Sequence, residues 1–240
     1  MINNVRNTVM FILNKDNNGY LTPDEFNAFA RQAQLEIFEE LFYDYNRWLA
    51  KRNSGASYSG SSDIRGASYS GSSDIPKLLS EIIDKFSTPL NLTYSAGEYQ
   101  MPTNVYSVTN ILYNNKDVER IEKNKLPYFL YSNHTAPSVY YPAYSQSGSK
   151  ITIYPSSIQT NVSTIYNRYP VDPKWTYYTD PVTQAPLFDQ TAPDYKNFEL
   201  PEVCQNDLII KILKYAGVSI REQEIVQVAS NEEANKNAQQ

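Results

Sequence analysis

The sequence predicts an α+β fold, in which helices from both chain ends pack as one helical layer and a central Pro/Tyr-rich antiparallel β region forms a second lobe. Two observations predict it. Apolar residues recur at three- and four-residue steps before residue 88 and after residue 200, whereas residues 89–199 contain short alternating segments. The composition divides the chain in the same way, because 15 of the 21 Tyr and most of the 14 Pro lie between residues 89 and 195.

Residues 1–88 are predicted to form an N-terminal helical region. Residues 3–13 form a short helix whose apolar side consists of Val5, Val9, Ile12 and Leu13. A stronger helix begins at Pro23 and continues without a breaker to Asn53, which corresponds to a length of about 40 Å. A third helix begins near Ile75 and ends near Thr88.

A Gly/Ser-rich segment interrupts these helices at residues 53–75. The decamer GASYSGSSDI at residues 55–64 returns unchanged at residues 66–75. Two such decamers are too few and too polar to bury a core, so the segment is predicted to be a flexible surface loop that tolerates a tandem duplication.

The β-rich region is predicted at residues 89–199. KITIY at residues 150–154 alternates as a half-buried strand does, and STIY at 163–166 and YFLY at 128–131 are interpreted as further short strands. VERIE at residues 118–122 is more polar and is predicted at an edge. The density of proline favours short, loop-rich antiparallel pairing over long central strands.

Helix is predicted to return at residues 200–232. One helix begins at Pro201 and ends at Gly217, and a second begins with the capping-box pattern of Ser219 and Glu222. Residues 233–240 contain no apolar anchor and are predicted to form a flexible tail.

Composition limits the classes of function. The 240 residues include 21 Lys+Arg and 26 Asp+Glu, which gives a net charge of -5 and disfavours a dedicated nucleic-acid or anionic-membrane binder. A single cysteine, Cys204, excludes an internal disulfide. The apolar run from Val9 to Leu13 is too short for a signal-peptide core or a membrane span. We therefore expect a soluble protein from a reducing compartment.

NKDNNGYLTPDE, at residues 14–25, resembles a calcium-binding EF-hand loop. Its ligands would be Asn14, Asp16, Asn18, Tyr20 through its carbonyl, and Glu25. Asn14 replaces the usual first aspartate, so calcium is a weak candidate cofactor. A structural explanation is favoured, in which Thr22 and Glu25 form a capping box around Pro23.

We find no pattern that predicts catalysis. The single histidine, His134, lies in a loop, and the sequence contains neither a nucleophile elbow nor a P-loop, dinucleotide fingerprint or Cys/His metal spacing. We therefore expect no enzyme activity, and we assign no catalytic or cofactor-binding residue. The Tyr-rich, nearly charge-free segments 128–145 and 153–170 suit either an obligate protein–protein interface or a carbohydrate- or receptor-binding face.

Four segments carry a resemblance to a known family. VRNTVMFILNKDNNGYLTPDEFNAFARQAQLEIFEELFYDYNRWL, ITIYPSSI, YNRYPVDPKW and FELPEVCQNDLIIKILKYAGVSIREQEIVQVA resemble segments of virion structural proteins from crAss-like tailed bacteriophages. The family's proteins are ring-shaped head–tail connector components, of the neck or tail hub. The Gly/Ser duplication departs from the resemblance.

The resemblance implies a function by assembly. It implies a homo-oligomeric ring, of twelve subunits, which joins the portal to adjacent tail and ring proteins and serves as a conduit for genome passage. Double-stranded DNA would pass through the channel without specific binding, and no membrane is involved. The expected location is the neck or tail of the virion, after assembly in the host cytoplasm.

Overall fold

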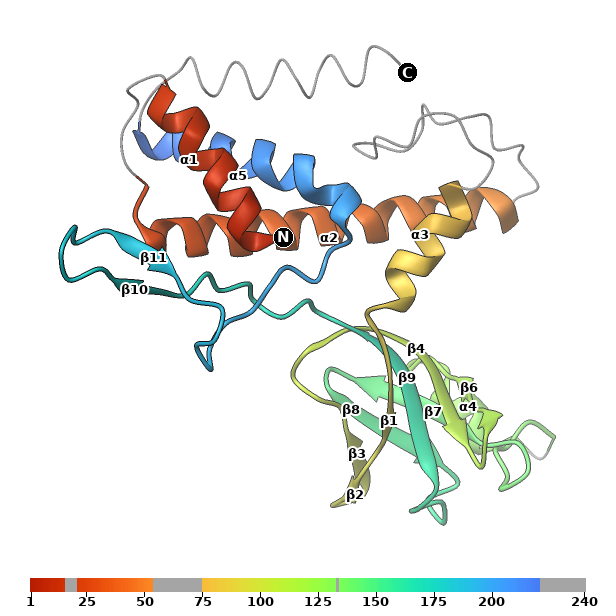
Figure 1. Cartoon of the computed structure of the whole chain (residues 1–240). Helices are drawn as coiled ribbons and strands as arrows, with labels where there is room; N and C mark the ends of the chain where they lie inside the picture. Colours follow the sequence, from red (N-terminus) through yellow and green to blue (C-terminus); the bar gives the residue numbers. More distant parts are fainter. Residues whose placement is uncertain (16–20, 54–74, 133, 221–240) are drawn as a thin grey trace. The chain divides into compact units, whose positions relative to one another are not determined.

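The computed structural model describes residues 1–15, 21–53, 75–132 and 134–220. The chain divides into two compact units (Figure 1). We call residues 1–83 and 170–240 the helical unit, and residues 84–169 the β unit. Among the described helices, none combines the length and the apolar character that spanning a bilayer requires.

The helical unit joins helices from both ends of the chain. It contains α1 (Ile2–Lys15), α2 (Pro23–Asn53), most of α3 (Ile75–Asp84), the 3-10 helix η2 (Glu202–Cys204) and α5 (Gln205–Ile220). Helix α5 contacts both α1 and α2, which confirms the predicted helical layer. Apolar faces of the three helices meet in its core, formed by Val5, Val9, Leu13, Phe26, Ala30, Phe38, Leu208, Ile212 and Ala216.

Residues 170–200 form an extended ribbon that belongs to the helical unit. Its two arms pair through an isolated bridge between Lys174 and Lys196, and farther out as the hairpin of β10 (Tyr177–Thr179) and β11 (Pro186–Phe188). Residues 170–199 are predicted to belong to the β-rich region, and they do contain β10 and β11. They group with the helical unit, however, and the compact β unit ends at Tyr169.

Two side-chain amides on α2 explain why this ribbon belongs with the helices. The Asn27 amide accepts a hydrogen bond from the Trp175 backbone N–H at 2.7 Å and donates one to the Trp175 carbonyl at 3.1 Å. The Gln34 amide donates to the Val171 carbonyl at 2.8 Å and accepts from the Glu199 N–H at 3.0 Å. Seven residues apart, the two amides lie on one face of the helix and supply the partners that a neighbouring strand would supply in a sheet.

Two sheets form the β unit. The first has the order β1-β9-β4-β5 and comprises β1 (Ser87–Asn91), β9 (Val162–Arg168), β4 (Val105–Tyr113) and β5 (Lys116–Asp117). The second has the order β2-β3-β8-β7-β6 and comprises β2 (Tyr94–Ser95), β3 (Glu98–Gln100), β8 (Lys150–Tyr154), β7 (Ala143–Ser147) and β6 (Glu119–Arg120). Strands β6 and β7 are parallel, whereas the other pairs in these sheets are antiparallel.

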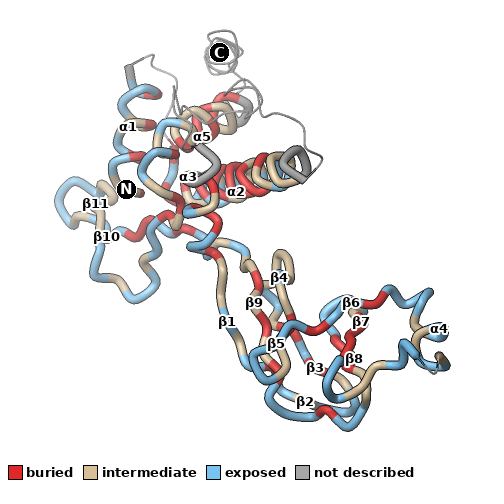
Figure 2. The backbone as a smooth tube through the Cα atoms, turned by 90° about the vertical axis from the view of Figure 1, so that its right-hand side faces the viewer, coloured by how far each residue is buried: buried red, intermediate tan, exposed pale blue. Residues whose placement is uncertain are grey.

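Both sheets contribute side chains to one apolar core, as the buried segments of Figure 2 indicate. Ile111, Val162 and Tyr166 come from the first sheet, and Tyr99, Tyr144, Ile151 and Ile153 come from the second. The buried Tyr99 hydroxyl donates a hydrogen bond to the Ile158 carbonyl at 3.2 Å, so its polar tip is satisfied inside this core.

Several sequence predictions agree with these elements. The predicted helices at residues 3–13 and 23–53 correspond to α1 and α2. KITIY is β8, STIY lies within β9, and VERIE contains β6 at the edge of its sheet. The structure therefore confirms the α+β class and the central, largely antiparallel β region.

Three local predictions are wrong. Residues 128–131 are not a strand, because Pro127 in the first turn starts the short helix α4 (Leu126–Leu130). The third helix ends at Asp84 rather than near Thr88, because residues 87–91 pair with β9. Helix α5 does not end at Gly217 but continues to Ile220, with Ala216 buried beside it. Here tertiary packing outweighs the local stop signal.

Some predictions fall on residues outside the described ranges. They concern most of the duplicated loop at 53–75, residues 221–232 of the last expected helix, and the tail at 233–240. Residues 16–20 of the EF-hand-like segment also lie outside. The predicted start of the last helix at Ser219 is also wrong, because Ser219 continues α5.

Candidate interaction surfaces

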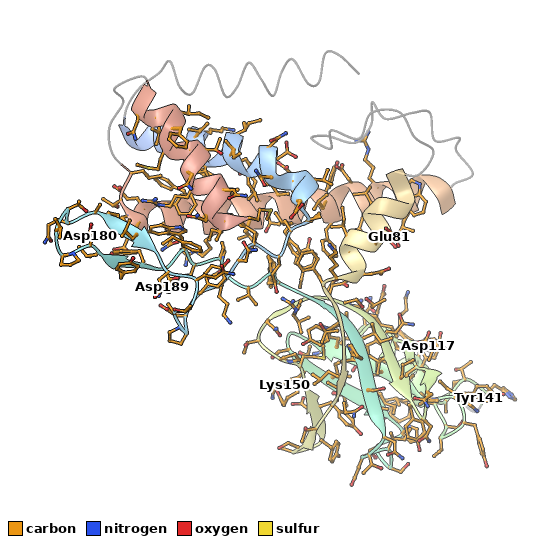
Figure 3. All side chains as sticks on the ribbon, in the orientation of Figure 1. Glu81, Asp117, Tyr141, Lys150, Asp180 and Asp189 are labelled. Carbon is orange, nitrogen blue, oxygen red and sulfur yellow. The ribbon has the colours of Figure 1, made fainter. Side chains whose placement is uncertain are left out.

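Residues 126–132 and 134–142 of the β unit, which we call the tyrosine loop, expose four aromatic side chains. Tyr128, Tyr131, Tyr140 and Tyr141 are between 79% and 89% exposed. No residue of α4, which begins this loop, is buried. Figure 2 shows the region largely in the colour of exposed residues, and Figure 3 shows Tyr141 in the part of the chain that extends beyond the strands.

Local hydrogen bonds order the backbone of the tyrosine loop. The Ser132 hydroxyl oxygen accepts from the N–H groups of His134 at 3.4 Å and Thr135 at 3.3 Å, and the Ser132 carbonyl accepts from Ala136 at 3.1 Å. Farther along, the Ser138 N–H donates to the Tyr141 carbonyl at 3.1 Å, while the Ser138 hydroxyl accepts from the Tyr141 N–H at 3.2 Å. Turns of this kind restrict the backbone on either side of them, which lowers the entropy cost of binding.

The tyrosine loop has almost no charge to desolvate. Between Lys125 and Lys150 the chain contains no Asp, Glu, Lys or Arg. Burying one of its aromatic side chains in a contact would contribute about 1.5–3 kcal/mol to the free energy of binding. The tyrosine hydroxyl groups can also form hydrogen bonds with a partner. Aromatic enrichment with charge depletion is typical of the centre of a protein–protein interface.

The helical unit exposes a second apolar surface on the β10–β11 hairpin. We call Tyr177, Tyr178, Val182 and Leu187 the hairpin surface. Val182 is 87% exposed and Tyr178 is 54% exposed, with the other two near 40%. The turn is held by Asp180, whose carboxylate accepts from the Val182 N–H at 3.1 Å and the Thr183 hydroxyl at 2.6 Å. These hydrogen bonds lower the Asp180 pKa, and Figure 3 shows this residue at the end of the hairpin.

An aromatic stack connects the hairpin to the helices. The buried Trp175 ring lies 5.6 Å from the Tyr177 ring and 5.8 Å from the Phe188 ring, both in stacked geometry. The Arg6 guanidinium of α1 lies 3.8 Å from the centre of the Trp175 ring, and the indole N–H donates to Asn3 at 3.0 Å. The hairpin surface is therefore a fixed part of the helical unit.

The EF-hand-like segment shows the capping box that the sequence predicts. The Glu25 carboxylate accepts from the Thr22 N–H at 2.9 Å and from its hydroxyl at 2.7 Å, and the Glu25 N–H donates to Thr22 Oγ1 at 3.3 Å. Hydrogen bonds from Thr22 lower the Glu25 pKa. Asn14 is exposed near the end of α1, whereas Asp16, Asn18 and Tyr20 lie outside the described residues. Calcium binding at these five residues stays a prediction.

A buried lysine joins α5 to α2. Lys211 Nζ lies 3.0 Å from Glu36 Oε1 and 2.9 Å from Glu40 Oε1, and the Tyr215 hydroxyl donates to Glu36 Oε2 at 2.6 Å. Burial opposes charge on Glu36, but the hydrogen bonds from Tyr215 and Lys211 outweigh it and lower the Glu36 pKa. Burial and the bond to Glu36 raise the Tyr215 pKa to about 12. The lysine and the tyrosine of α5 are both paired with glutamates of α2, which fits a structural link between the two helices.

The remaining reactive side chains are separated. His134 is exposed in the tyrosine loop of the β unit, and Cys204 is buried in η2 of the helical unit. Within the described ranges, no three His, Cys, Asp or Glu side chains gather closely enough to hold a metal ion.

Of the two segments that the sequence suggests as interfaces, only the first is broadly exposed. Within residues 128–145, the part up to Tyr141 belongs to the tyrosine loop, whereas Ala143, Tyr144 and Ser145 are buried in β7. Residues 153–170 include β9, whose Val162, Thr164 and Tyr166 are buried. Sequence reasoning does not single out the hairpin surface. Its signal is present in YYTDPVTQAPLF at residues 177–188, where Asp180 is the one charged residue.

Comparison with protein-family models and with curated proteins finds no match for this sequence.

Proposed function

We propose that this protein is a virion structural protein that forms an oligomeric ring in the portal-to-tail connector of a tailed bacteriophage. Its partners are copies of itself, about twelve in a ring by the family resemblance, together with the portal and adjacent tail proteins. The ring acts by assembly, as a conduit for double-stranded DNA, and needs no catalytic residue or cofactor.

The observation that carries the proposal is the exposure of ordered, nearly charge-free aromatic surface on both units. The tyrosine loop lies on the β unit and the hairpin surface lies on the helical unit. Clustered exposed apolar side chains typically mark contact sites. A subunit with two different contact surfaces suits head-to-tail assembly, which closes into a ring when the rotation between neighbours permits.

The charge of the chain is compatible with a conduit. A net charge of -5 provides no general attraction for phosphate, so DNA would move past the subunits with little sticking. Gel-shift titration with duplex DNA tests this part of the proposal, and tight binding at physiological salt would contradict it.

Native mass spectrometry of the purified full chain tests the assembly. We expect a closed oligomer whose mass is an integer multiple of the 27.5 kDa chain, and a ring in negative-stain images. A protein that stays monomeric at all concentrations, and that is missing from purified virions, would exclude the connector function.

A carbohydrate- or receptor-binding tail component is the second candidate. The observation that favours it is the exposure of Tyr140 and Tyr141 side by side in sequence on an ordered loop, since exposed aromatic faces also stack on sugars. Glycan arrays probed with the wild type and a Tyr140→Ser/Tyr141→Ser variant distinguish the two. Glycan retention that the variant loses would favour this candidate, and blank arrays would remove it.

A further inference from the structure

We propose that the tyrosine loop of one copy docks on the hairpin surface of the next copy, so that the β unit of each subunit contacts the helical unit of its neighbour. This inference rests on the proposed ring assembly and specifies which surfaces form its repeated contact.

Charge favours this pairing. Residues 84–169 contain seven Lys and Arg and five Asp and Glu, so the β unit carries a net charge of +2 and the rest of the chain -7. The ribbon at residues 170–200 contains five Asp and Glu against two Lys and Arg, a local net charge of -3. A weakly positive unit meeting an acidic ribbon is electrostatically complementary, whereas β unit on β unit or ribbon on ribbon brings like charges together.

The contact centres contain little charge that must be desolvated. The tyrosine loop contains no Asp, Glu, Lys or Arg. On the hairpin, the Asp180 carboxylate already accepts hydrogen bonds from Val182 and Thr183 within its own turn. Tyr140 and Tyr141 can therefore pack on Tyr178 and Val182 next to a single charged group, Asp180, whose two hydrogen bonds are kept in the contact.

Symmetry gives a second reason for unlike surfaces. A loop that bound a second loop would use the same surface twice and would stop at a dimer, leaving the hairpin surface exposed on both copies. When the loop of each subunit binds the hairpin surface of the next, every subunit uses both surfaces. Such head-to-tail contacts can join more than two copies.

A complementation experiment tests the pairing. The loop variant carries Tyr140→Ser and Tyr141→Ser, and the hairpin variant carries Tyr178→Ser and Val182→Ser. All four side chains are more than half exposed, so neither variant loses core packing. Tyr43→Ser, which removes a 65% exposed tyrosine from α2, is the matched control. Each protein is purified separately, and assemblies are weighed by native mass spectrometry alone and after mixing.

We expect wild type and Tyr43→Ser to form the closed oligomer, and each double variant alone to be monomeric. A mixture of the two variants should yield a 1:1 heterodimer and nothing larger, because one intact loop and one intact hairpin remain to meet. Formation of that heterodimer also shows that both variants are folded.

Other outcomes overturn the inference. Dimers of the hairpin variant alone would show that loops bind loops. Wild-type rings that persist in either variant, or a mixture without heterodimers, would exclude the loop–hairpin contact while leaving the ring function standing. A monomeric wild type would exclude the proposed function and this inference together.

Discussion

Pro89 lies opposite Ile165 in the pairing of β1 with β9, at a position where the two strands exchange no ladder hydrogen bonds. In an antiparallel pair, hydrogen-bonded positions alternate with positions that are not hydrogen-bonded. The two hydrogen bonds that flank β1 show which positions are which. Arg168 donates its N–H to the Phe86 carbonyl at 3.0 Å, and Leu92 donates to the Val162 carbonyl at 2.9 Å. Because Phe86 and Leu92 are hydrogen-bonded toward β9, the residues at 87, 89 and 91 direct their backbone groups away from it.

This placement protects an edge of the sheet. β1 is the terminal strand in the order β1-β9-β4-β5, and Pro89 has no N–H to offer to an approaching strand. The N–H that Pro89 lacks would point away from β9, so β1 and β9 keep all the hydrogen bonds between them. Strand addition at this edge is thereby discouraged, and association is left to side-chain surfaces such as the tyrosine loop.

Replacing Pro89 with Val should keep the β unit folded but make the chain associate through the β1 edge. The variant gives the middle residue of β1 a backbone N–H that points away from β9, and valine favours strand conformation. Size-exclusion chromatography and thioflavin T fluorescence measure the change. Asn91→Val is the matched control, since it adds the same side chain to an exposed outer position without adding an N–H. Equal aggregation of both variants would show that apolarity, not the restored donor, is responsible.

Replacing Gln34 with Met should reduce the free energy of unfolding by about 1–3 kcal/mol, because two part-buried hydrogen bonds are lost and each contributes about 0.5–1.5 kcal/mol. The change removes the partners of the Val171 carbonyl and the Glu199 N–H. Asn46→Met, at an exposed site on the same helix, is the control and should change stability by less than about 0.5 kcal/mol. Urea denaturation measures both. Equal effects would show that the Gln34 amide does not hold the ribbon.

Replacing Thr22 with Ala should destabilise the chain by about 1 kcal/mol through loss of the α2 capping box. The effect should depend on pH. Thr22 lowers the Glu25 pKa below its ordinary value of 4.5, so this contribution is present above pH 4.5 and is lost as the pH falls through the folded pKa. The gap between the thermal melts of the two proteins should therefore narrow from neutral to acidic pH, and a constant gap would show that the Glu25 carboxylate does not stabilise the cap.

Calcium provides a separate test of the same segment. We expect millimolar calcium to leave the melting temperature unchanged, because Glu25 is held by Thr22 and only Asp16 and Glu25 among the candidate ligands are charged. Magnesium at the same concentration controls for general ion effects. A calcium-specific rise in melting temperature that Glu25→Gln abolishes would instead establish an EF-hand-like site at residues 14–25.

The sequence predicts the elements whose signal is local. α2 has a Pro start, a capping box and a long apolar periodicity, and β8 has strict alternation, so both agree with the structure. The segment YFLY at residues 128–131 has too few residues to separate alternation from a helical turn, and Pro127 decides for helix. The tyrosine loop is still found from composition, because charge depletion is visible without the fold.

The ribbon could not be assigned from sequence because its partners are far away in the chain. Asn27 and Trp175 are 148 residues apart, and Gln34 and Glu199 are 165 apart. A single amide on a helix carries no local signature of a distant backbone group. The hairpin surface has no local signal for the same reason. Trp175 packs against Asn3 and Arg6 of α1, and this distant contact determines which face of the ribbon is exposed.

Replacing Lys211 with Met should destabilise the helical unit by about 1–3 kcal/mol, because Glu36 and Glu40 lose the cation between them. Glu36 and Glu40 are 35% and 44% exposed, which keeps the cost below that of a fully buried pair. Lys174→Met is the matched control. It removes a 2.6 Å ion pair with Asp194 in which both side chains are more than half exposed and screened by solvent, so it should destabilise the chain less than Lys211→Met does.

The pH dependence of the Lys211→Met effect separates electrostatics from packing. In the wild type the Glu36 pKa is lowered, so its contribution is present above the ordinary value of 4.5 and is lost as the pH falls through the folded pKa. The Lys211 pKa is raised, so its contribution is complete below 10.5 and is lost only as the pH rises through the folded value. Urea denaturation should therefore give a constant difference between about pH 5 and pH 10, and a smaller one in acid. A difference that stays constant into acid would assign the effect to lost packing of the lysine stem.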